Sequence, residues 1–579
     1  IFLVSILILA AFRIFEDYSF KKIVLLSYLL GLFMTNRMDI LLTAPALGVL
    51  LLPKVLTDLK TDFIKKFSLA TAFFTLGFSL YLYILLRSNS NPMFDWSHPA
   101  DIATFLAVIT RKSYGSTLDL ISKNYAIGEL FLPNMKYYFI HLFSNFNFAL
   151  LLIPFGLYKF YSISRERFYS ILTLFIITGP LFLFWANMPP NPHSLAVVEP
   201  NYIVPDIAIL FWIAFGAFYF YELKAKKYIL LISAILITSI VYAAFYNFPK
   251  SNRRFLFFAS DYAEDVFKSV PQGGTVVAKK DVQIFSLWYL QNINHKRPDI
   301  KVIAQGLSGA NWYQNSYKIW HDGFSPLNLK SDDISNWEDM AEMTGNNMFI
   351  TMDVSMPASA PSIPRGMVTE IYPKRKFISE NSNLWHFFNL EWLGEPYKDF
   401  FDSDLANSYL QAGVNLSAYD NLQGKMNKVS RDRLFMALLA DSDKAKPYLY
   451  LGFYHIAKND WENGKKYFKQ AALADEKLLK LAKEYRSLQD AVDGVLKSAA
   501  YSWLNYGVSL EKTGFPEEAE KAYLKALLRN PAFAQAHYNM AILYWREDTN
   551  RVIKELKATL AIDPNHKQAA YYLNQFKRK

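Results

Sequence analysis

Polar residues suited to binding a phosphate stand between two apolar runs near the start of the chain. The run 23–34 is followed by the sequence TNRMD, and the next apolar run covers 40–52. A guanidinium binds a phosphate through two parallel hydrogen bonds, and ionisable groups held within membrane-like segments tend to be functional. Asn36, Arg37 and Asp39 are therefore candidate phosphate-binding residues. The alternative interpretation is a hairpin turn closed by an internal Arg37–Asp39 ion pair.

A long polar segment, 87–136, contains the second group of candidates. It includes Trp96 in the sequence DWSHP and Tyr114 in the sequence SYG. Loops of this length between helices often bind something, so we expect Trp96 and Tyr114 to line a groove for an acceptor or a lipid. The alternative is that both rings only anchor the loop at a membrane surface. His98 has no second ligand at metal-binding spacing, so we predict no metal site.

The third group of candidates precedes and enters the apolar run 203–221. Glu199 and Tyr202 stand at its start, and Asp206 falls about one helical turn inside it. A carboxylate at that depth requires a partner or water, so we expect these three residues to line the same groove. The alternative is an acid that reaches the membrane interface. We expect His193, in the preceding loop, to be structural.

These candidate residues must be positioned by eight apolar runs, of which residues 228–246 are the last. Residues 228–246 contain no charged side chain and would form a helix of about 28 Å, the thickness of a bilayer core. We therefore predict an α-helical polytopic membrane bundle over residues 1–249. Its runs are 1–12, 23–34, 40–52, 67–86, 137–157, 168–186, 203–221 and 228–246.

The chain opens at Ile1 inside an apolar run, without a basic leader. We therefore expect N-terminal residues, including one or more further spans, to be missing from it.

Positive charge alternates between successive loops of this bundle. Four loops hold 3, 4, 3 and 3 Lys and Arg residues, whereas the turn 36–38 holds one and the loop 187–199 none. Basic loops face the cytoplasm, so the intervening loops and residues 250–579 are predicted to be extracytoplasmic. We expect a protein of the bacterial inner membrane. The basic loops are 13–22, 54–66, 158–167 and 222–227.

Residues 250–400 are predicted to form a small soluble α/β domain. Strand-like segments occur at 275–278, 300–304 and 348–352, a helical segment at 282–292, and a loop rich in Pro and Ser at 357–364. Lys279, Lys280 and Asp281 follow the first strand, where α/β proteins often bind ligands, but the sequence has no Gly-rich phosphate loop. No nucleotide site is predicted.

Residues 401–579 carry the spacing of a tetratricopeptide repeat (TPR), which predicts an all-α TPR solenoid. Such repeats bind proteins or peptides, so we expect partners of that kind. One copy of the 34-residue pattern contains Trp503, Tyr506, Gly507, Leu510, Gly514, Ala519, Tyr523, Ala526 and Pro531.

Composition excludes several function classes. The chain has no cysteine, which rules out disulfides and thiolate catalysis. The net charge of +11 is spread over the chain without a dense basic stripe, so nucleic acid is not an expected partner. No cofactor is expected.

Several stretches together resemble a membrane family of unknown function that is similar to the protein O-mannosyltransferases of the GT-C glycosyltransferase class and often precedes TPR repeats. The resemblance covers roughly residues 1–320. It is carried by GLFMTNRMDILLTAPAL at 31–47, by the DWSHP and SYG sequences, by EPNYIVPDIAI at 199–209, and by the LWYLQ…RPD…WY pattern that ends at Tyr313.

This resemblance implies a GT-C-like membrane bundle and a glycosyltransferase. Such an enzyme takes a sugar, here mannose, from a polyprenyl-phosphate carrier and passes it to an extracytoplasmic acceptor such as a protein Ser or Thr hydroxyl. The resemblance places the family's catalytic carboxylate in an outer loop after the first span, a region that we expect to precede Ile1. The chain also departs from the family at residues 278–281, which read AKKD where a GDND-like run is usual.

With this resemblance, Asn36, Arg37 and Asp39 are expected to bind the lipid phosphate. The residues expected to line the acceptor or lipid groove are Trp96, Tyr114, Glu199, Tyr202 and Asp206. The alternative function is a non-enzymatic, membrane-anchored TPR scaffold for assembly of envelope proteins.

Overall fold

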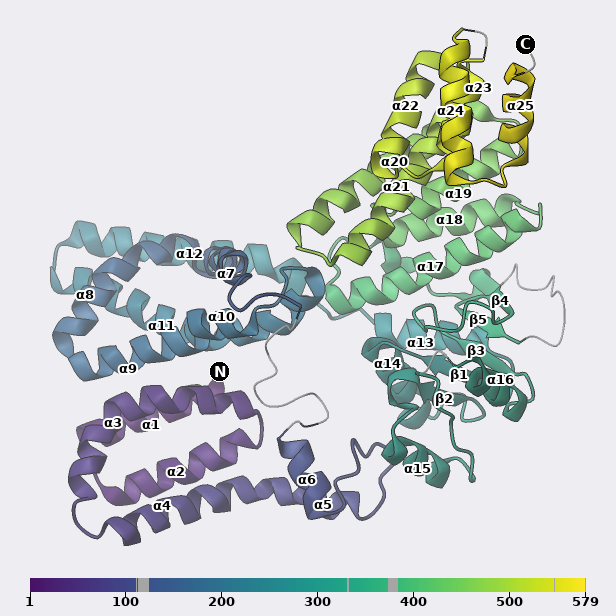
Figure 1. Ribbon diagram of the computed structural model, residues 1–579. Helices are drawn as coiled ribbons and strands as arrows, with labels where there is room; N and C mark the ends of the chain where they lie inside the picture. Colours follow the sequence, from purple (N-terminus) through teal and green to yellow (C-terminus); the bar gives the residue numbers. More distant parts are fainter. Residues whose placement is uncertain (111, 113–123, 331–332, 373–383, 546, 578–579) are drawn as a thin grey trace. The chain divides into compact units, whose positions relative to one another are not determined.

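A computed structural model describes residues 1–110, 112, 124–330, 333–372, 384–545 and 547–577. The chain divides into two compact units (Figure 1). Unit 1 comprises 1–253 together with 315–323, and unit 2 comprises 254–314 together with 324–579.

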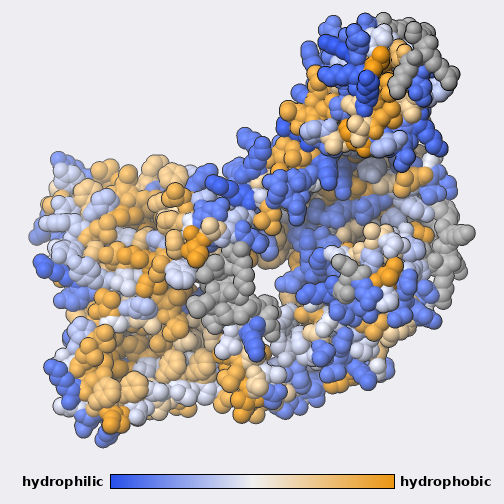
Figure 2. All heavy atoms as spheres, viewed as in Figure 1, coloured by the Kyte–Doolittle hydropathy of each residue, from blue (hydrophilic) through white to orange (hydrophobic). Residues whose placement is uncertain are grey.

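Unit 1 is helical, and six of its helical segments are long and apolar enough to cross a membrane. Figure 2 shows hydrophobic side chains over much of its visible flank. The chain is therefore an integral membrane protein. The segments are Met38–Asp58, Phe63–Ser88, Phe131–Ile163, Arg165–Ala186, Pro192–Glu222 and Lys226–Ser251.

The helices of unit 1 follow the predicted apolar runs, but several are longer than the runs. The run 40–52 has 13 residues, and the 3-10 turn η1 (Met38–Thr43) continues into α3 (Ala44–Asp58) to make one segment of 21 residues. The helix α11 begins at Pro192 instead of 203, so the prediction of a loop at 187–199 was wrong for its larger part, and His193 lies in a helix. In contrast, α1 (Phe2–Glu16) and α2 (Phe20–Met34) have 15 residues each, about 22 Å. The other elements are α4 (Phe63–Phe78), α5 (Leu82–Ser88), α6 (Ile102–Ile109), α7 (Phe131–Phe146), η4 (Asn147–Leu152), α8 (Ile153–Ile163), α9 (Arg165–Ile176), η5 (Ile177–Leu181), α10 (Phe182–Ala186), α11 (Pro192–Glu222) and α12 (Lys226–Ser251).

Glycines allow the helices of unit 1 to approach backbone to backbone. A Cβ added at Gly31 of α2 would lie 2.1 Å from the carbonyl oxygen of Phe74 in α4. A Cβ at Gly156 of α8 would lie 1.7 Å from the carbonyl oxygen of Trp212 in α11. Small residues serve this purpose between membrane helices, where no hydrophobic effect drives association.

The four basic loops meet at one end of unit 1. Arg167 pairs with Glu16 at 2.7 Å, and the Tyr18 hydroxyl donates to Asp58 at 3.1 Å. Lys159 forms an ion pair with Glu222. These contacts join loops 13–22, 54–66, 158–167 and 222–227, as the alternation of charge requires. The compartment on that side remains a prediction.

Unit 2 begins with a five-stranded sheet in the order β2-β1-β3-β5-β4. Strand β1 (Thr275–Ala278) pairs in parallel with β2 (Lys301–Ala304) and β3 (Met348–Ile350), the three strands indicated by the sequence. The hairpin of β4 (Ser362–Arg365) and β5 (Val368–Ile371) adds an antiparallel edge. Part of β4 lies in the segment 357–364, so the prediction of a loop there was wrong at its end. The sheet is accompanied by α13 (Phe258–Ser269), α14 (Asp281–Asn292), α15 (Asn311–Trp320, whose second half belongs to unit 1) and α16 (Ile334–Met343).

The rest of unit 2 consists of TPR-like pairs of helices. In successive pairs, a small residue of the first helix meets a ring of the second: a Cβ at Gly452 would lie 2.4 Å from Phe468, and one at Gly507 would lie 2.5 Å from Tyr523. This is the role that the repeat spacing gives to its small and large positions. The helices are α17 (Phe400–Leu422), α18 (Lys428–Ala440), α19 (Ala445–Ile456), α20 (Trp461–Glu484), α21 (Gln489–Lys512), α22 (Pro516–Arg529), α23 (Ala534–Leu543), α24 (Thr549–Ile562) and α25 (Lys567–Lys577).

Candidate functional site

Arg37 lies just beyond the C-terminal end of α2, at the end of unit 1 opposite the basic loops. Its Nη2 is 2.6 Å from Asp39 Oδ2, and its Nε donates to Asp39 Oδ1 at 3.2 Å. Nη2 also donates to Asn201 Oδ1 of α11 at 3.0 Å. The internal ion pair of the alternative interpretation is thus present, but the Arg37 side chain is 54% exposed and remains accessible to a ligand.

Asn36, beside Arg37, is also exposed, and its backbone N–H donates to the carbonyl oxygen of Phe33 at 3.0 Å. We call Asn36, Arg37, Asp39 and Asn201 the Arg37 site. Asn201 stands in the sequence between Glu199 and Tyr202, where the chain enters the run 203–221, but a neutral amide at this position gives no signal of a role in the site. Whether the site binds a phosphate stays a prediction.

The candidates on α11 do not all face the Arg37 site. At about 100° per residue, Glu199 and Asp206 lie within about 20° of each other around the helix, whereas Asn201 lies about 160° from Glu199. Tyr202 lies on the same half of the helix as Asp206. Glu199, Tyr202 and Asp206, which we expected to line one groove, therefore share one flank of α11, and Asn201 lies on the other.

The second flank contains a histidine–aspartate contact between α7 and α11. His141 Nε2 lies 2.8 Å from Asp206 Oδ2, and the two side chains are 20% and 14% exposed. The partner that a carboxylate at this depth requires is thus His141. The sequence analysis missed His141, although it is the one His, Lys, Arg, Asp or Glu in the apolar run 137–157.

Two tyrosines cover the imidazole of His141. The ring centroids of Tyr138 and Tyr202 lie 6.0 and 5.0 Å from that of His141. Both residues are at most 2% exposed. Among the described residues, neither hydroxyl makes a hydrogen bond of ordinary geometry, and the same holds for Asp206 Oδ1. The Tyr138 hydroxyl interacts with the Asp206 carboxylate, so the Tyr202 hydroxyl is the buried polar atom of this group that remains for water or a ligand.

Two asparagines extend this cluster toward α12. Asn145 Nδ2 lies 3.2 Å from His141 Nδ1, and Asn247 Nδ2 donates to Asn145 Oδ1 at 3.4 Å. Glu199 interacts electrostatically with His141 and with Lys250 near the end of α12. We call the following residues the His141 site: Tyr138, His141, Asn145, Glu199, Tyr202, Asp206 and Asn247.

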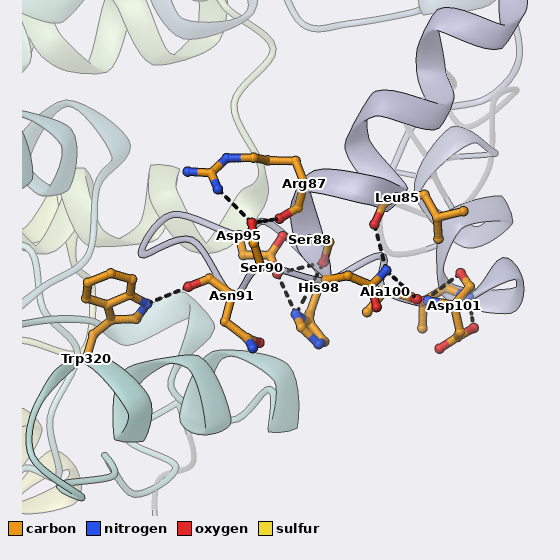
Figure 3. A network of polar contacts seen from close by, with 12 residues as sticks. Leu85, Arg87, Ser88, Ser90, Asn91, Asp95, His98, Ala100, Asp101 and Trp320 are labelled. Carbon is orange, nitrogen blue, oxygen red and sulfur yellow. Dashed lines mark hydrogen bonds and ion pairs between the residues drawn. The ribbon is translucent and has the colours of Figure 1, made fainter.

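The segment that follows α5 folds around Asp95 (Figure 3). Ser88 Oγ donates to Asp95 Oδ2 at 2.7 Å, and His98 Nδ1 contacts the same oxygen. A serine, a histidine and an aspartate, the residue types of a hydrolase triad, therefore meet in this segment. Because one imidazole nitrogen faces both partners, with Ser88 Oγ at 3.3 Å, the group cannot relay a proton from serine to aspartate through the ring.

The same segment is fixed by further contacts visible in Figure 3. Arg87 Nη1 donates to Ser90 Oγ at 2.6 Å, and Trp320 Nε1, from the segment 315–323 of unit 1, donates to the carbonyl oxygen of Asn91 at 3.0 Å. Trp96 is 41% exposed on this loop. Tyr114 lies outside the described residues. In the described part of the chain, no group of three His, Asp or Glu side chains could hold a metal ion.

The crevice at the carboxyl ends of β1 and β3, where open α/β sheets bind ligands, is filled by α17. Lys280 pairs with Asp404 of α17 and with Asp353 at 3.1 Å. Gln283 donates to Asp353 at 2.8 Å and to Ser408 at 3.0 Å. Burial lowers the pKa of Lys280, but the hydrogen bonds and charges of both carboxylates outweigh it and raise that pKa. We call this group the Lys280 crevice.

Comparison with known proteins identifies one part of the chain. Residues 259–385, about a fifth of the chain, match the family described as TMEM260-associated domain 2. No curated protein matches the chain.

Two solved structures contain TPR or assembly proteins. The TPR protein YrrB, which has an unusual peptide-binding site, is 20% identical over 29% of this chain and 91% of its own, with a TM-score of 0.16. The APC/C hetero-tetramer Cut9–Hcn1 is 13% identical over 87% and 89%, with a TM-score of 0.20. The TPR-like fold is shown by the packing of the helix pairs described above and not by these two similarities. The chain is an integral membrane protein with a segment similar to TMEM260-associated domain 2 and a TPR-like helical region.

Proposed function

We propose that this protein is a membrane glycosyltransferase that takes mannose from a polyprenyl-phosphate carrier and passes it to an extracytoplasmic acceptor, such as a Ser or Thr hydroxyl of a protein. The observation that carries the proposal is the hydrogen bond from Arg37 to Asn201. It joins two segments 164 residues apart. Both segments belong to the stretches that resemble the O-mannosyltransferase-like family.

Arg37 is suited to the leaving group of such a reaction. When the bond between the sugar and the phosphate breaks, negative charge develops on the phosphate oxygen, and a preoriented cation stabilises it. Asp39 and Asn201 hold two of the guanidinium nitrogens in place, and the side chain is about half exposed. Trp96 is a candidate for the wall of the acceptor groove.

Transfer of radiolabelled mannose from polyprenyl-phosphate mannose to a Ser/Thr-containing acceptor, measured in membranes that contain the protein, tests the proposal. We expect Arg37→Ala to lower transfer by about 100-fold or more, as for removal of other transition-state charge partners. Arg13→Ala, in a basic loop at the opposite end, is the matched control and should retain transfer. Equal transfer by Arg37→Ala and the control would remove Arg37 from the site.

A membrane-anchored scaffold is the second candidate function. It is favoured by the Lys280 crevice, where protein side chains fill the position of a ligand, and by the repeat helices, a type of surface that binds peptides. Replacing the exposed rings Tyr501 and Tyr571 by serine separates the two functions. A scaffold predicts that this double variant loses envelope assembly while Arg37→Ala retains it. If the protein is an enzyme, Arg37→Ala loses sugar transfer and the double tyrosine variant retains it.

A further inference from the structure

We infer that a groove between α7 and α12 in unit 1 binds one anionic phospholipid of the surrounding membrane. The inference does not depend on the proposed sugar transfer. It follows from where the groove lies along α12, from the cations beside it, and from the side of α7 on which it opens.

The groove has a volume of about 840 Å³ and runs along one side of α7. Its α7 residues follow one another at spacings of three and four, which places them on the same face of the helix. Leu132 and Phe139 are 76% and 61% exposed, so the described chain leaves this face open to lipid. The lining residues include Leu132, Lys136, Phe139 and Phe143 of α7 and Tyr242 and Tyr246 of α12.

The α12 wall indicates how deep the groove lies in the membrane. Lys226 begins α12 at the end of unit 1 where the basic loops meet, and Tyr246 follows 20 residues later, about 30 Å along the helix. This length equals the thickness of the hydrocarbon core of a bilayer. Tyr246 therefore lies at the boundary between hydrocarbon and headgroups, where tyrosine rings are enriched, and Tyr242 lies about one turn deeper.

Two lysines accompany the apolar rings of the groove. Lys250 Nζ lies 3.7 Å from the centroid of the Tyr246 ring, and Glu199 offsets part of its charge. Lys136 Nζ lies 5.8 Å from the centroid of the Tyr137 ring and makes no ion pair with a carboxylate of the described residues. A lipid phosphate at the headgroup boundary supplies the anionic partner of Lys136, while the acyl chain covers the rings.

The groove is separate from the Arg37 site. At about 100° per residue, Phe143 and His141 lie about 160° apart around α7. Since His141 contacts Asp206 of α11, the groove opens on the side of α7 that faces away from α11. Arg37 contacts Asn201 on the other flank of α11. A carrier lipid whose phosphate binds Arg37 therefore leaves the groove free, and the occupant of the groove is a second lipid.

Photolabelling of the whole protein in phosphatidylcholine nanodiscs tests the inference. The probe is a phospholipid with a diazirine on one acyl chain and either a phosphatidylglycerol or a phosphatidylcholine headgroup, and peptide mass spectrometry locates the label. We expect the anionic probe to label Phe139, Phe143 and Tyr246 at least about five-fold more than the zwitterionic probe, the effect of one lysine near a membrane surface. Ile237 and Ile240, exposed on the opposite side of α12, should be labelled equally by both probes.

Substitution of the lysines shows which cation holds the headgroup. Lys136→Gln keeps most of the side chain but removes its charge, so labelling of the groove by the anionic probe should fall about five-fold, with labelling by the zwitterionic probe unchanged. Lys250→Gln should have a smaller effect, because Glu199 already offsets part of that charge. Lys227→Gln is the matched control, since Lys227 Nζ also lies over a ring, 4.9 Å from the centroid of Tyr228, but at the other end of α12. This variant should keep wild-type labelling of the groove.

Competition identifies the occupant. Unlabelled phosphatidylglycerol should displace the anionic probe from the groove. Displacement by polyprenyl phosphate but not by phosphatidylglycerol would overturn the inference, because the groove would then hold the carrier. Equal labelling of the groove by both probes, or unchanged labelling in Lys136→Gln, would overturn it as well and leave only the lipid that surrounds any membrane protein. Labelling is measured without sugar transfer, so a failure of the proposed function is distinguishable from a failure here.

Discussion

The His141 site in unit 1 and the Lys280 crevice in unit 2 are built from similar side chains but differ in how those side chains are satisfied. In the crevice, Lys280 has two carboxylate partners and Gln283 bonds to Asp353 and Ser408. At the His141 site, Asp206 has an imidazole and the Tyr138 hydroxyl as partners and, among the described residues, no lysine or arginine within ion-pair distance. Each cluster also has a buried tyrosine hydroxyl that makes no hydrogen bond of ordinary geometry with the described residues: Tyr262 beside the crevice and Tyr202 at the His141 site.

This difference separates a structural cluster from a candidate site. A cluster in which the carboxylates face a cation stabilises the elements that it joins, here β1, β3 and α17. A buried carboxylate without a lysine or arginine partner is costlier to keep. The membrane-spanning region, where water is scarce, makes that cost higher than in unit 2.

Removing a carboxylate from the crevice is expected to lower the stability of unit 2 strongly. Asp353→Ala leaves the Nζ of Lys280 and the amide of Gln283 without one partner each. We expect the free energy of unfolding of unit 2 to fall by about 3 kcal/mol, measured by denaturant titration of the whole protein in detergent. Sugar transfer by the molecules that remain folded should be unchanged. A loss of transfer without a loss of stability would contradict the distinction between the two clusters.

The buried carboxyl of Asp265 makes the stability of unit 2 depend on pH. Burial raises the pKa of its carboxyl to about 6, although Lys268, Tyr409 and the Asn389 N–H partly oppose this. Because this pKa lies above the ordinary value of 3.8, the folded state binds the proton more tightly than the unfolded state. The carboxyl therefore favours folding most below pH 4, and this contribution is lost between about pH 4 and pH 6.

We expect the stability of unit 2, relative to that of Asp265→Asn, to fall by up to about 3 kcal/mol over this interval, because one pKa unit corresponds to about 1.4 kcal/mol. Thermal melts of both proteins from pH 4 to pH 7 measure the difference. Parallel pH dependence of the two proteins would show that Asp265 does not titrate in this range.

The tightness of helix packing in the two units can be compared at two glycines, Gly156 and Gly507. A Cβ at Gly156 would meet the backbone oxygen of Trp212, which cannot move alone, whereas a Cβ at Gly507 would meet the ring of Tyr523. Overpacking against a side chain costs roughly 1–3 kcal/mol. We expect Gly507→Ala to lie in that range and Gly156→Ala to exceed it, as read from thermal melts of the two variants. A larger effect of Gly507→Ala would contradict this ranking.

The sequence by itself determined the features that depend on local periodicity. Apolar runs marked the membrane-spanning helices, the cations at 13–22, 54–66, 158–167 and 222–227 marked loops that share one end, and the repeat spacing marked the TPR-like helices. Each signal lies within a few dozen residues, because a helix of given length and amphipathicity is specified by its own residues. The parallel strands β1, β2 and β3 were found for the same reason.

Only the tertiary structure decided which polar residues meet. Arg37 and Asn201 are 164 residues apart, His141 and Asp206 are 65 apart, and Lys280 and Asp404 are 124 apart. Such pairings follow from how helices pack around their glycines and apolar faces, and no local pattern encodes them. The sequence placed Glu199, Tyr202 and Asp206 together, and they share one flank of α11. It did not show that Asn201 lies on the other flank and meets Arg37, because that depends on how α11 is rotated in the bundle.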